Sequence, residues 1–314
     1  MLKKKPQLFV FMTVMPLAFL SCMFLGGRDP LARIAKREMV AVPGGTYTQE
    51  DGAESFDHTV SSFSMAKYEV TYELWYEVYQ WATANGYAFQ NPGRGGGSIG
   101  AVPAPGNYEP VTTISWRDVI VWCNAYSQMA ELTPVYYTDA AHTTLIMSSE
   151  DANAAECDAA VPDWSADGYR LPTEGEWQCA ASYKDGASWL PYDHASGDTS
   201  SYCHPSDAGT STVFGDYAWY NGNAGMTAKD VGTKTENHLG IFDMSGNAFE
   251  WCYDWYAAYP GASTDYRGPA SDSNHVIRGG SFLGTTGPLQ VGYRGEQPPD
   301  SANGVLGFRL AKSD

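Results

Sequence analysis

The chain has 314 residues, 43% of them hydrophobic and 14% aromatic, with 33 glycines and a formal net charge of −17. The acidic excess opposes nucleic-acid binding, because that affinity depends largely on neutralisation of phosphates by Lys and Arg. The length is sufficient for a sizeable core, and the abundance of glycine and aromatic residues favours one loop-rich domain over a helical bundle.

The N-terminus has the features of an export signal. Three lysines at residues 3–5 precede an apolar run over residues 8–20, which is too short for a membrane span of about 20 residues. Ser21 and Cys22 follow, as at a lipoprotein cleavage site, so we expect residues 1–21 to be removed and Cys22 to carry lipid. The alternative is an ordinary cleaved signal with an incidental cysteine. Lipidation implies an exported protein anchored in the outer membrane at the cell surface.

The mature chain would be still more acidic. Removing the three signal lysines from the 19 basic residues leaves 16 against 36 acidic ones, a formal charge of −20. Membrane attachment would therefore depend on lipid, not on charge. Residues 22–38 are polar and mildly basic and are expected to form a tether. We expect residues 39–314 to form a single domain, because neither a long repeat nor a second boundary is visible.

Turn residues and alternation predict the irregular parts of this domain. Residues 39–42 and 45–47 are predicted as two strands separated by a proline-glycine turn. A glycine- and proline-rich tract over residues 91–105 predicts a long exposed loop. The acidic stretch over residues 134–164 predicts a surface insertion.

Three helices are predicted from capping residues followed by apolar residues at helical spacing. The N-caps are Thr71 for the first helix, Ser115 with Asp118 for the second, and Thr173 with Glu176 for the third. Aromatic residues on their apolar faces are explained more simply by core packing than by cofactor binding.

Four sequence blocks follow one another in a characteristic order: GYRLPTEGEW at 168–177, GIFDMSGNAFEW at 240–251, RGGS at 278–281 and LGFRL at 306–310. In content and order they resemble the formylglycine-generating enzyme, or sulfatase-modifying factor, family. The resemblance implies an α+β fold, the C-type lectin fold of the formylglycine-generating-enzyme type. It also implies an opening β-hairpin and a core pair formed by the second and third helices. A shared fold does not determine function, so the site must be argued separately.

Cysteine content argues against the family's chemistry. The resemblance implies that its enzymes use two cysteines just after the Gly-Gly-Ser block to bind copper, which thiolates suit. Here Gly284 occupies the first of these positions, the second has no equivalent, and no cysteine follows Ser281. We therefore expect no redox cofactor and no such enzyme activity. The mature chain keeps Cys22 and five further cysteines, at 123, 157, 179, 203 and 252; some could pair in an exported protein, in a pattern the sequence leaves open.

No other catalytic motif is apparent. The six histidines are isolated, without the spacing of a metal site. The cluster Gly93 to Gly97 lacks the lysine and hydroxyl of a phosphate-binding loop, so a flexible loop is the better interpretation.

The block at 240–251 suggests a structural calcium site, which the family also has at these positions. The carbonyls of Asp243, Gly246 and Ala248 could converge with the Glu250 carboxylate to give the all-oxygen surrounding that Ca²⁺ prefers. The alternative is that Glu250 holds the loop through hydrogen bonds and packing. A second site could involve Asn221 or Asn223.

Within the family, the chain is similar to the variable proteins of diversity-generating retroelements, exported lipoproteins without the catalytic cysteines. Family-like anchors such as Arg278 and Arg294 alternate here with unpatterned residues over 282–305. Anchors can hold a backbone while the loops between them change. We therefore expect a diversified face that binds variable macromolecular ligands, chiefly proteins. Its expected ligand contacts are Phe282, Leu283, Gly284, Thr285, Thr286, Gly287, Tyr293, Gly295, Glu296, Ser301, Asn303, Gly304 and Val305.

Two other functions remain open at this point. One is an enzyme on the same scaffold with different chemistry, and the other is a structural envelope lipoprotein. A cysteine or histidine pair on the C-terminal face would have favoured the enzyme, and the sequence has none there.

Overall fold

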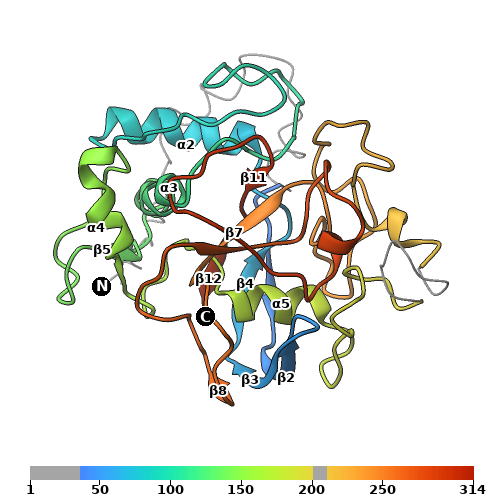
Figure 1. The fold of residues 1–314 in the computed structure, drawn as a ribbon. Helices are drawn as coiled ribbons and strands as arrows, with labels where there is room; N and C mark the ends of the chain where they lie inside the picture. The colour runs from blue at the N-terminus through green and yellow to red at the C-terminus, as the bar shows by residue number, and fades with distance from the viewer. Residues whose placement is uncertain (1–35, 201–210) are drawn as a thin grey trace, which may run out of the picture.

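The computed structural model describes residues 36–200 and 211–314. The predicted signal peptide, Cys22, most of the tether and Cys203 lie outside the described residues. The described part is a loop-rich domain of mixed helices and small sheets (Figure 1), which confirms the predicted α+β class. Within these ranges, no helix combines the length and the apolar character needed to cross a membrane.

The strands are β1 (Met39–Val42), β2 (Gly45–Glu50), β3 (Ser55–Val60), β4 (Phe63–Ala66), β5 (Tyr136–Tyr137), β6 (Val161–Pro162), β7 (Phe249–Trp255), β8 (Ser263–Thr264), β9 (His275–Arg278), β10 (Gly295–Gln297), β11 (Leu306–Gly307) and β12 (Ala311–Ser313). They form a sheet β10-β9-β7-β11, two smaller sheets β1-β4-β12 and β2-β3-β8, and the pair β5-β6. The last strands of the chain thus complete sheets begun by much earlier strands.

The expected opening hairpin is wrong, although both strands exist. β1 pairs antiparallel with β4, and β2 pairs with β3 in a different sheet. The turn between β1 and β2 contains Gly44 at φ +66°, and a Cβ there would lie 2.4 Å from the Val60 carbonyl oxygen. A left-handed glycine in close contact with β3 redirects the chain from one sheet to the next.

The α-helices are α2 (Tyr72–Ala84), α3 (Trp116–Met129), α4 (Ala154–Asp158) and α5 (Glu174–Ser182), and the 3₁₀ turns are η2 (Asp151–Asn153), η3 (Phe214–Asp216) and η4 (Gly287–Leu289). The three predicted N-caps are confirmed. Thr71 accepts a hydrogen bond from the Leu74 amide, and capping boxes begin α3 and α5. Such caps satisfy amides that a helix start leaves without partners.

Aromatic side chains fill the core between α2 and α3. The rings of Trp75 and Trp122 stack with centroids 5.5 Å apart, and Phe308 packs edge-on against both at 6.0 and 5.4 Å. All three residues are fully buried. Core packing of the helix aromatics is thus confirmed for Trp75 and Trp122, and the phenylalanine of the C-terminal LGFRL block joins them in the core.

The predicted insertion over residues 134–164 is only partly a surface feature. Its Tyr136 and Cys157 are fully buried, and the Asn124 side chain of α3 donates to the Tyr136 carbonyl at 2.8 Å. A buried amide holds this segment against α3, so it belongs to the core. The loop over residues 91–105 is exposed as predicted, with Ile99 and Val102 at 58% and 72% exposure.

The domain begins before the expected boundary at Met39. The Lys36 ammonium donates to the Val231 carbonyl at 2.7 Å, and Arg37 pairs with Glu77 at 2.7 Å. The final residues of the expected tether are thus bound to the domain.

Candidate ligand-binding face

The predicted variable segment, residues 282–305, runs from the end of β9 to the start of β11 and contributes β10 on the way (red in Figure 1). Gly279 and Gly280 begin the excursion at φ +89° and +77°. A Cβ on Gly280 would lie 2.8 Å from the Pro288 carbonyl oxygen. The Gly-Gly pair therefore allows the chain to turn out of β9 and to pass close to its own returning part.

Arg278 fixes the returning part of the segment through backbone contacts. Its guanidinium, which has no exposed surface, donates to the carbonyls of Val291, Gly292 and Tyr293 at 2.9, 2.8 and 2.6 Å. It also donates to the Gln178 side-chain oxygen at 2.6 Å. Because these acceptors on the segment are main-chain atoms, the contact does not depend on which side chains the segment carries.

Arg294 supplies a second anchor. Its Nε and Nη2 donate to the two carboxylate oxygens of Glu174 at 2.6 and 2.9 Å, in a largely buried bidentate pair. The same guanidinium lies 4.1 Å above the ring of Tyr259. Glu174 is the first residue of α5, where a negative charge is also favourable for the helix.

Both carboxylate oxygens of Glu250 already accept hydrogen bonds from protein groups, which disfavours coordination of a calcium ion. Arg309 donates to both of its carboxylate oxygens at 2.6 and 2.7 Å, and the Trp177 indole donates at 2.7 Å. Both members of the ion pair are fully buried. A guanidinium on the same two oxygens repels a divalent cation, so the geometry favours the hydrogen-bonding alternative for Glu250. The calcium site stays a hypothesis whose charged ligand would first have to leave Arg309.

The other predicted calcium ligands lie in a tightly bonded loop beside this pair. Asp243 has φ +58° and accepts from the Gly232 amide at 2.6 Å through Oδ2, while its buried Oδ1 has no partner among the described residues. Gly246 donates its amide to the Gly279 carbonyl, and Ala248 donates to Glu69. The loop is therefore ordered by protein contacts at each of these residues.

Burial perturbs the acids of this loop. Desolvation raises the pKa of Asp243 to about 6, against the opposing effects of the Gly232 hydrogen bond, Arg309 and Lys36. Burial also raises the pKa of Glu69 well above its usual range, and the neighbouring carboxylates of Asp243 and Glu250 add to the effect. Three carboxyl groups thus share one region of low polarity around Arg309.

The predicted contact residues differ in exposure. Phe282, expected as a ligand contact, is instead buried: it is only 7% exposed, and its amide donates to the Asn247 carbonyl at 2.8 Å. Leu283, which follows it, is 45% exposed. Thr285, Glu296 and Asn303 are also exposed, whereas the remaining predicted contacts, Gly284, Thr286, Gly287, Tyr293, Gly295, Ser301, Gly304 and Val305, are half-buried.

The structure brings some of these residues together and separates others. Phe282 and Val305 bind opposite ends of the short stretch 247–249, through the Asn247 carbonyl and the Phe249 amide. The Tyr293 ring lies 6.4 Å from that of Phe249. Glu296, by contrast, lies on β10, at the opposite edge of the sheet from β11. Phe282, Tyr293 and Val305 therefore lie around residues 247–249, whereas Gly295 and Glu296 lie on the edge strand β10.

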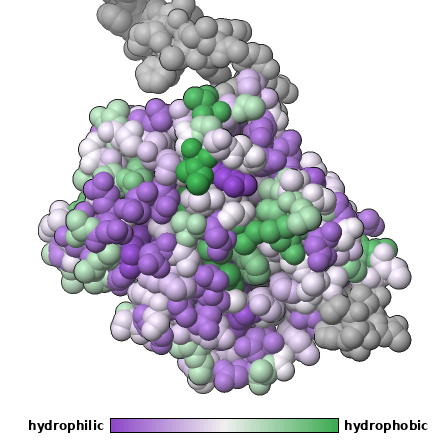
Figure 2. All heavy atoms as spheres, turned by 45° about the horizontal axis from the view of Figure 1, so that its top comes forward, coloured by the Kyte–Doolittle hydropathy of each residue, from purple (hydrophilic) through white to green (hydrophobic). Residues whose placement is uncertain are grey.

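A loop outside the segment also reaches this face, which the sequence pattern did not predict. The Asn221 amide donates to the Gly284 carbonyl at 3.1 Å, which places the loop after Trp219 beside Leu283. Met226 in that loop is 73% exposed. Figure 2, with the top of Figure 1 turned forward, shows apolar surface gathered between polar areas. An apolar residue in a polar loop was the only available signal for Met226.

The cysteines of the described ranges offer no reactive site. Those cysteines are Cys123, Cys157, Cys179 and Cys252, all free and buried, so none of the four forms the disulfide that export allowed. Burial raises the pKa of Cys157 and Cys179 to about 12 and raises that of the other two as well. A thiol with so high a pKa is a poor nucleophile and metal ligand.

Comparison with known proteins places this geometry in a family. The model of the sulfatase-modifying factor enzyme 1-like domain matches residues 28–314, so the chain belongs to that family. It is 29% identical to the formylglycine-generating enzyme of Thermomonospora curvata, over 87% of this chain and 92% of that one. It is 27% identical to the chaperone protein LppX of Paenibacillus barcinonensis, over 97% and 98%.

Among solved structures, variable protein 1 of Treponema denticola is similar to this chain with a TM-score of 0.71 and 31% identity. The similarity covers 88% of this chain and 95% of that one. The resemblance to the variable proteins, like that to the family fold, is thereby confirmed.

Proposed function

We propose that this protein is a non-catalytic, surface-displayed lipoprotein whose segment 283–305 binds a macromolecular ligand, chiefly protein, and differs between copies of the gene. The observation that carries the proposal is that some residues of the segment are fixed by buried contacts while others are exposed to solvent. Arg278 binds its backbone and Arg294 is buried against Glu174, while Leu283, Thr285 and Asn303 face solvent. Exposed side chains on a fixed backbone are suited to variable recognition.

Two further observations support a binding role over family chemistry. The described cysteines are buried and lie outside the segment after Ser281, which itself contains none. The similar proteins include a variable protein and one named a chaperone, although others are enzymes. We expect the purified protein to form no formylglycine on a sulfatase-type cysteine peptide, with or without copper. Copper-dependent aldehyde formation would contradict the proposal.

Variation can be tested by sequencing the gene and its flanks from several isolates. We expect a near-identical template repeat and differences at template adenines, concentrated between Leu283 and Val305. Arg278, Arg294 and Arg309 should remain unchanged, because each is buried and bonded. Substitutions spread evenly along the domain, or the absence of a template, would overturn diversification.

Display depends on Cys22, which we propose carries the lipid that anchors the protein in the outer membrane. Replacing Cys22 with Ala should abolish lipid labelling and release the protein from membranes, because the acidic chain has no other membrane anchor in this proposal. Persistent labelling of the variant would identify another acceptor.

A further inference from the structure

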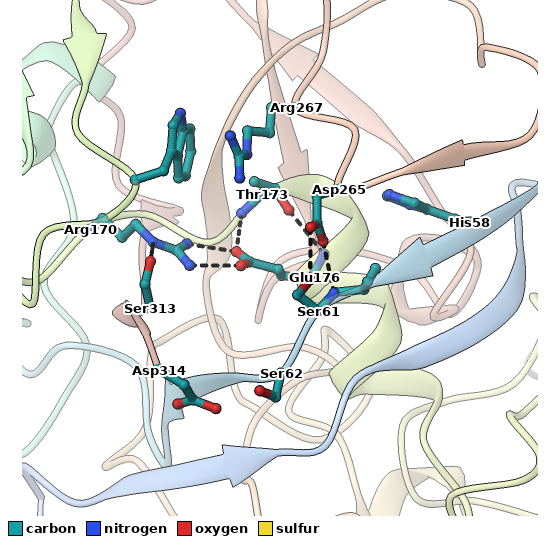
Figure 3. Close-up of a pocket in the computed structure, with 12 residues that line it drawn as sticks. His58, Ser61, Ser62, Arg170, Thr173, Glu176, Asp265, Arg267, Ser313 and Asp314 are labelled. Atoms are coloured by element: carbon teal, nitrogen blue, oxygen red, sulfur yellow. Dashed lines mark hydrogen bonds and ion pairs between the residues drawn. The ribbon is translucent and has the colours of Figure 1, made fainter.

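A polar cavity of about 210 Å³ lies near the C-terminus, remote from the proposed ligand face. Its walls come from the end of β3, the turn into β4, the segment before α5, α5 itself, the residues after β8, and β12 (Figure 3). No residue of the segment 282–305 lines it. In Figure 1, β8 is at the bottom of the domain and β11 near the top, so the two regions are far apart.

Two of the charged groups in this cavity neutralise each other. Arg170 donates to both carboxylate oxygens of Glu176 at 2.7 Å, and both residues are buried. His58 is also satisfied, because its Nδ1 bonds to Gln49 at 2.7 Å and its Nε2 accepts from the Tyr266 amide at 3.0 Å. Because these groups are already paired, they shape the wall of the cavity, and other side chains must bind the ligand.

Arg267 is the free donor of the cavity. Its guanidinium lies 4.1 Å above the ring of Trp164, and within the described ranges it has no hydrogen-bond or ion-pair partner. Stacking on the indole fixes the plane of the guanidinium and leaves its N–H groups available at the edges. In Figure 3, Arg267 enters at the top of the cavity, and Ser62 and Asp314 lie opposite, at the bottom.

Two carboxylates line the same cavity. Asp265 accepts from the amide and the hydroxyl of Ser61 at 2.7 and 2.8 Å, which leaves lone pairs on both carboxylate oxygens. The exposed Asp314 adds a second carboxylate. With Arg170 and Glu176 paired, one positive and two negative side chains remain. This balance disfavours a phosphate or another anion, while Arg267 disfavours a cation.

We propose that this cavity binds a single neutral sugar ring. A sugar hydroxyl both donates and accepts, so neighbouring hydroxyls can bind a carboxylate and the Arg267 guanidinium together. The volume is below the roughly 300–1,000 Å³ of sites for drug-sized ligands, which limits the ligand to one small unit. This site is independent of the variable face, and either can exist without the other.

The test is a titration of the purified protein with glucose, galactose, mannose and N-acetylglucosamine, each free and as its methyl glycoside, monitored by calorimetry and saturation-transfer NMR. We expect at least one to bind with a Kd in the millimolar range. Arg267→Met, which keeps the stem over Trp164 but removes the donors, should weaken binding at least tenfold. The control Leu283→Ala, on the other face, should leave the Kd unchanged.

Binding of the methyl glycoside would indicate the end of a glycan, and binding of the free sugar alone would indicate a soluble sugar. Ser62→Val, at an exposed turn position, provides a second variant if Arg267→Met fails to fold, and it too should weaken binding. The proposal is overturned if none of the sugars binds, if glycine or inorganic phosphate binds instead, or if a variant that folds retains the parent affinity.

Discussion

Arg309 and Glu250 form a bidentate ion pair with no exposed surface on either side chain, at Nε–Oε2 and Nη2–Oε1 distances of 2.6 and 2.7 Å. Breaking a buried pair by removing one charge leaves the other uncompensated, at a cost of about 3–5 kcal/mol. We therefore expect Glu250→Gln to lower the free energy of unfolding by about that amount, equally in calcium and in chelator, as measured by urea unfolding. Glu77→Gln, at the half-exposed pair with Arg37, is the control and should cost less than about 1 kcal/mol.

A larger loss in calcium than in chelator would reverse this conclusion. It would mean that Glu250 ligates calcium, because the loss of metal-binding free energy adds to the loss of the ion pair only where the metal is bound.

Asp243 should make stability depend on pH. Its folded pKa of about 6 exceeds the ordinary value of 3.8, so its contribution is fully present below about pH 4 and is lost as the pH rises through 6. Asn keeps the shape and tolerates positive φ. Asp243→Asn should therefore be more stable than the parent at pH 8, by roughly 1–3 kcal/mol, with the difference vanishing near pH 4. Thermal unfolding across this range provides the measurement, and a variant less stable at pH 8 would contradict the assignment.

Lysine should not substitute for Arg278 without a loss of stability. Its guanidinium makes four hydrogen bonds, three of them to carbonyls of residues 291–293, and an ammonium cannot reproduce this planar fork. We expect Arg278→Lys to destabilise the domain by about 2–4 kcal/mol in urea unfolding. Arg37→Lys, in a half-exposed ion pair, is the matched control and should stay within about 0.5 kcal/mol. Similar losses in the two variants would show that the backbone contacts of Arg278 contribute little.

Adjacent positions 282 and 283 should respond in opposite ways to a polar substitution. Leu283→Asp should change the free energy of unfolding by no more than about 0.5 kcal/mol, because the side chain is 45% exposed. Phe282→Asp places a carboxylate in a site that is 7% exposed and should cost more than about 3 kcal/mol. Chemical denaturation of both variants tests this. Equal losses in the free energy of unfolding would contradict the assignment of position 282 as buried and position 283 as exposed.

Local signals predicted local structure well. Thr71, Ser115 and Thr173 begin helices because a side-chain oxygen next to free amides is a short-range feature. Strand pairing was harder to predict, since β1 and β4 are separated in sequence by two strands that belong to a different sheet. Tyr136 is likewise buried through its contact with α3, and no pattern within residues 134–164 predicts that contact.

The sequence predicted the buried arginines that hold the candidate site, but not which of its side chains are exposed. Arg278 and Arg309 belong to recognisable blocks, and the structure gives both a buried, bonded position. The orientation of Phe282 depends on the Asn247 carbonyl beyond the segment, so composition alone placed it on the wrong side. The loop after Trp219 reaches the face through the bond of the Asn221 amide to the Gly284 carbonyl, a tertiary contact that no local pattern predicts.

β9 and β11 pair with opposite edges of β7, so the segment between them leaves and re-enters the sheet about two strand spacings apart, roughly 10 Å. Ends held this close by a third strand define a closed, transferable unit. Exposed stretches of this segment could be replaced by loops of different sequence and length at a small entropic cost, since each doubling of loop length adds only about 0.6 kcal/mol. The domain is in this respect a host for designed binding loops, provided that each insert keeps the buried Phe282, the backbone of residues 291–293 that Arg278 binds, and the pair of Arg294 with Glu174.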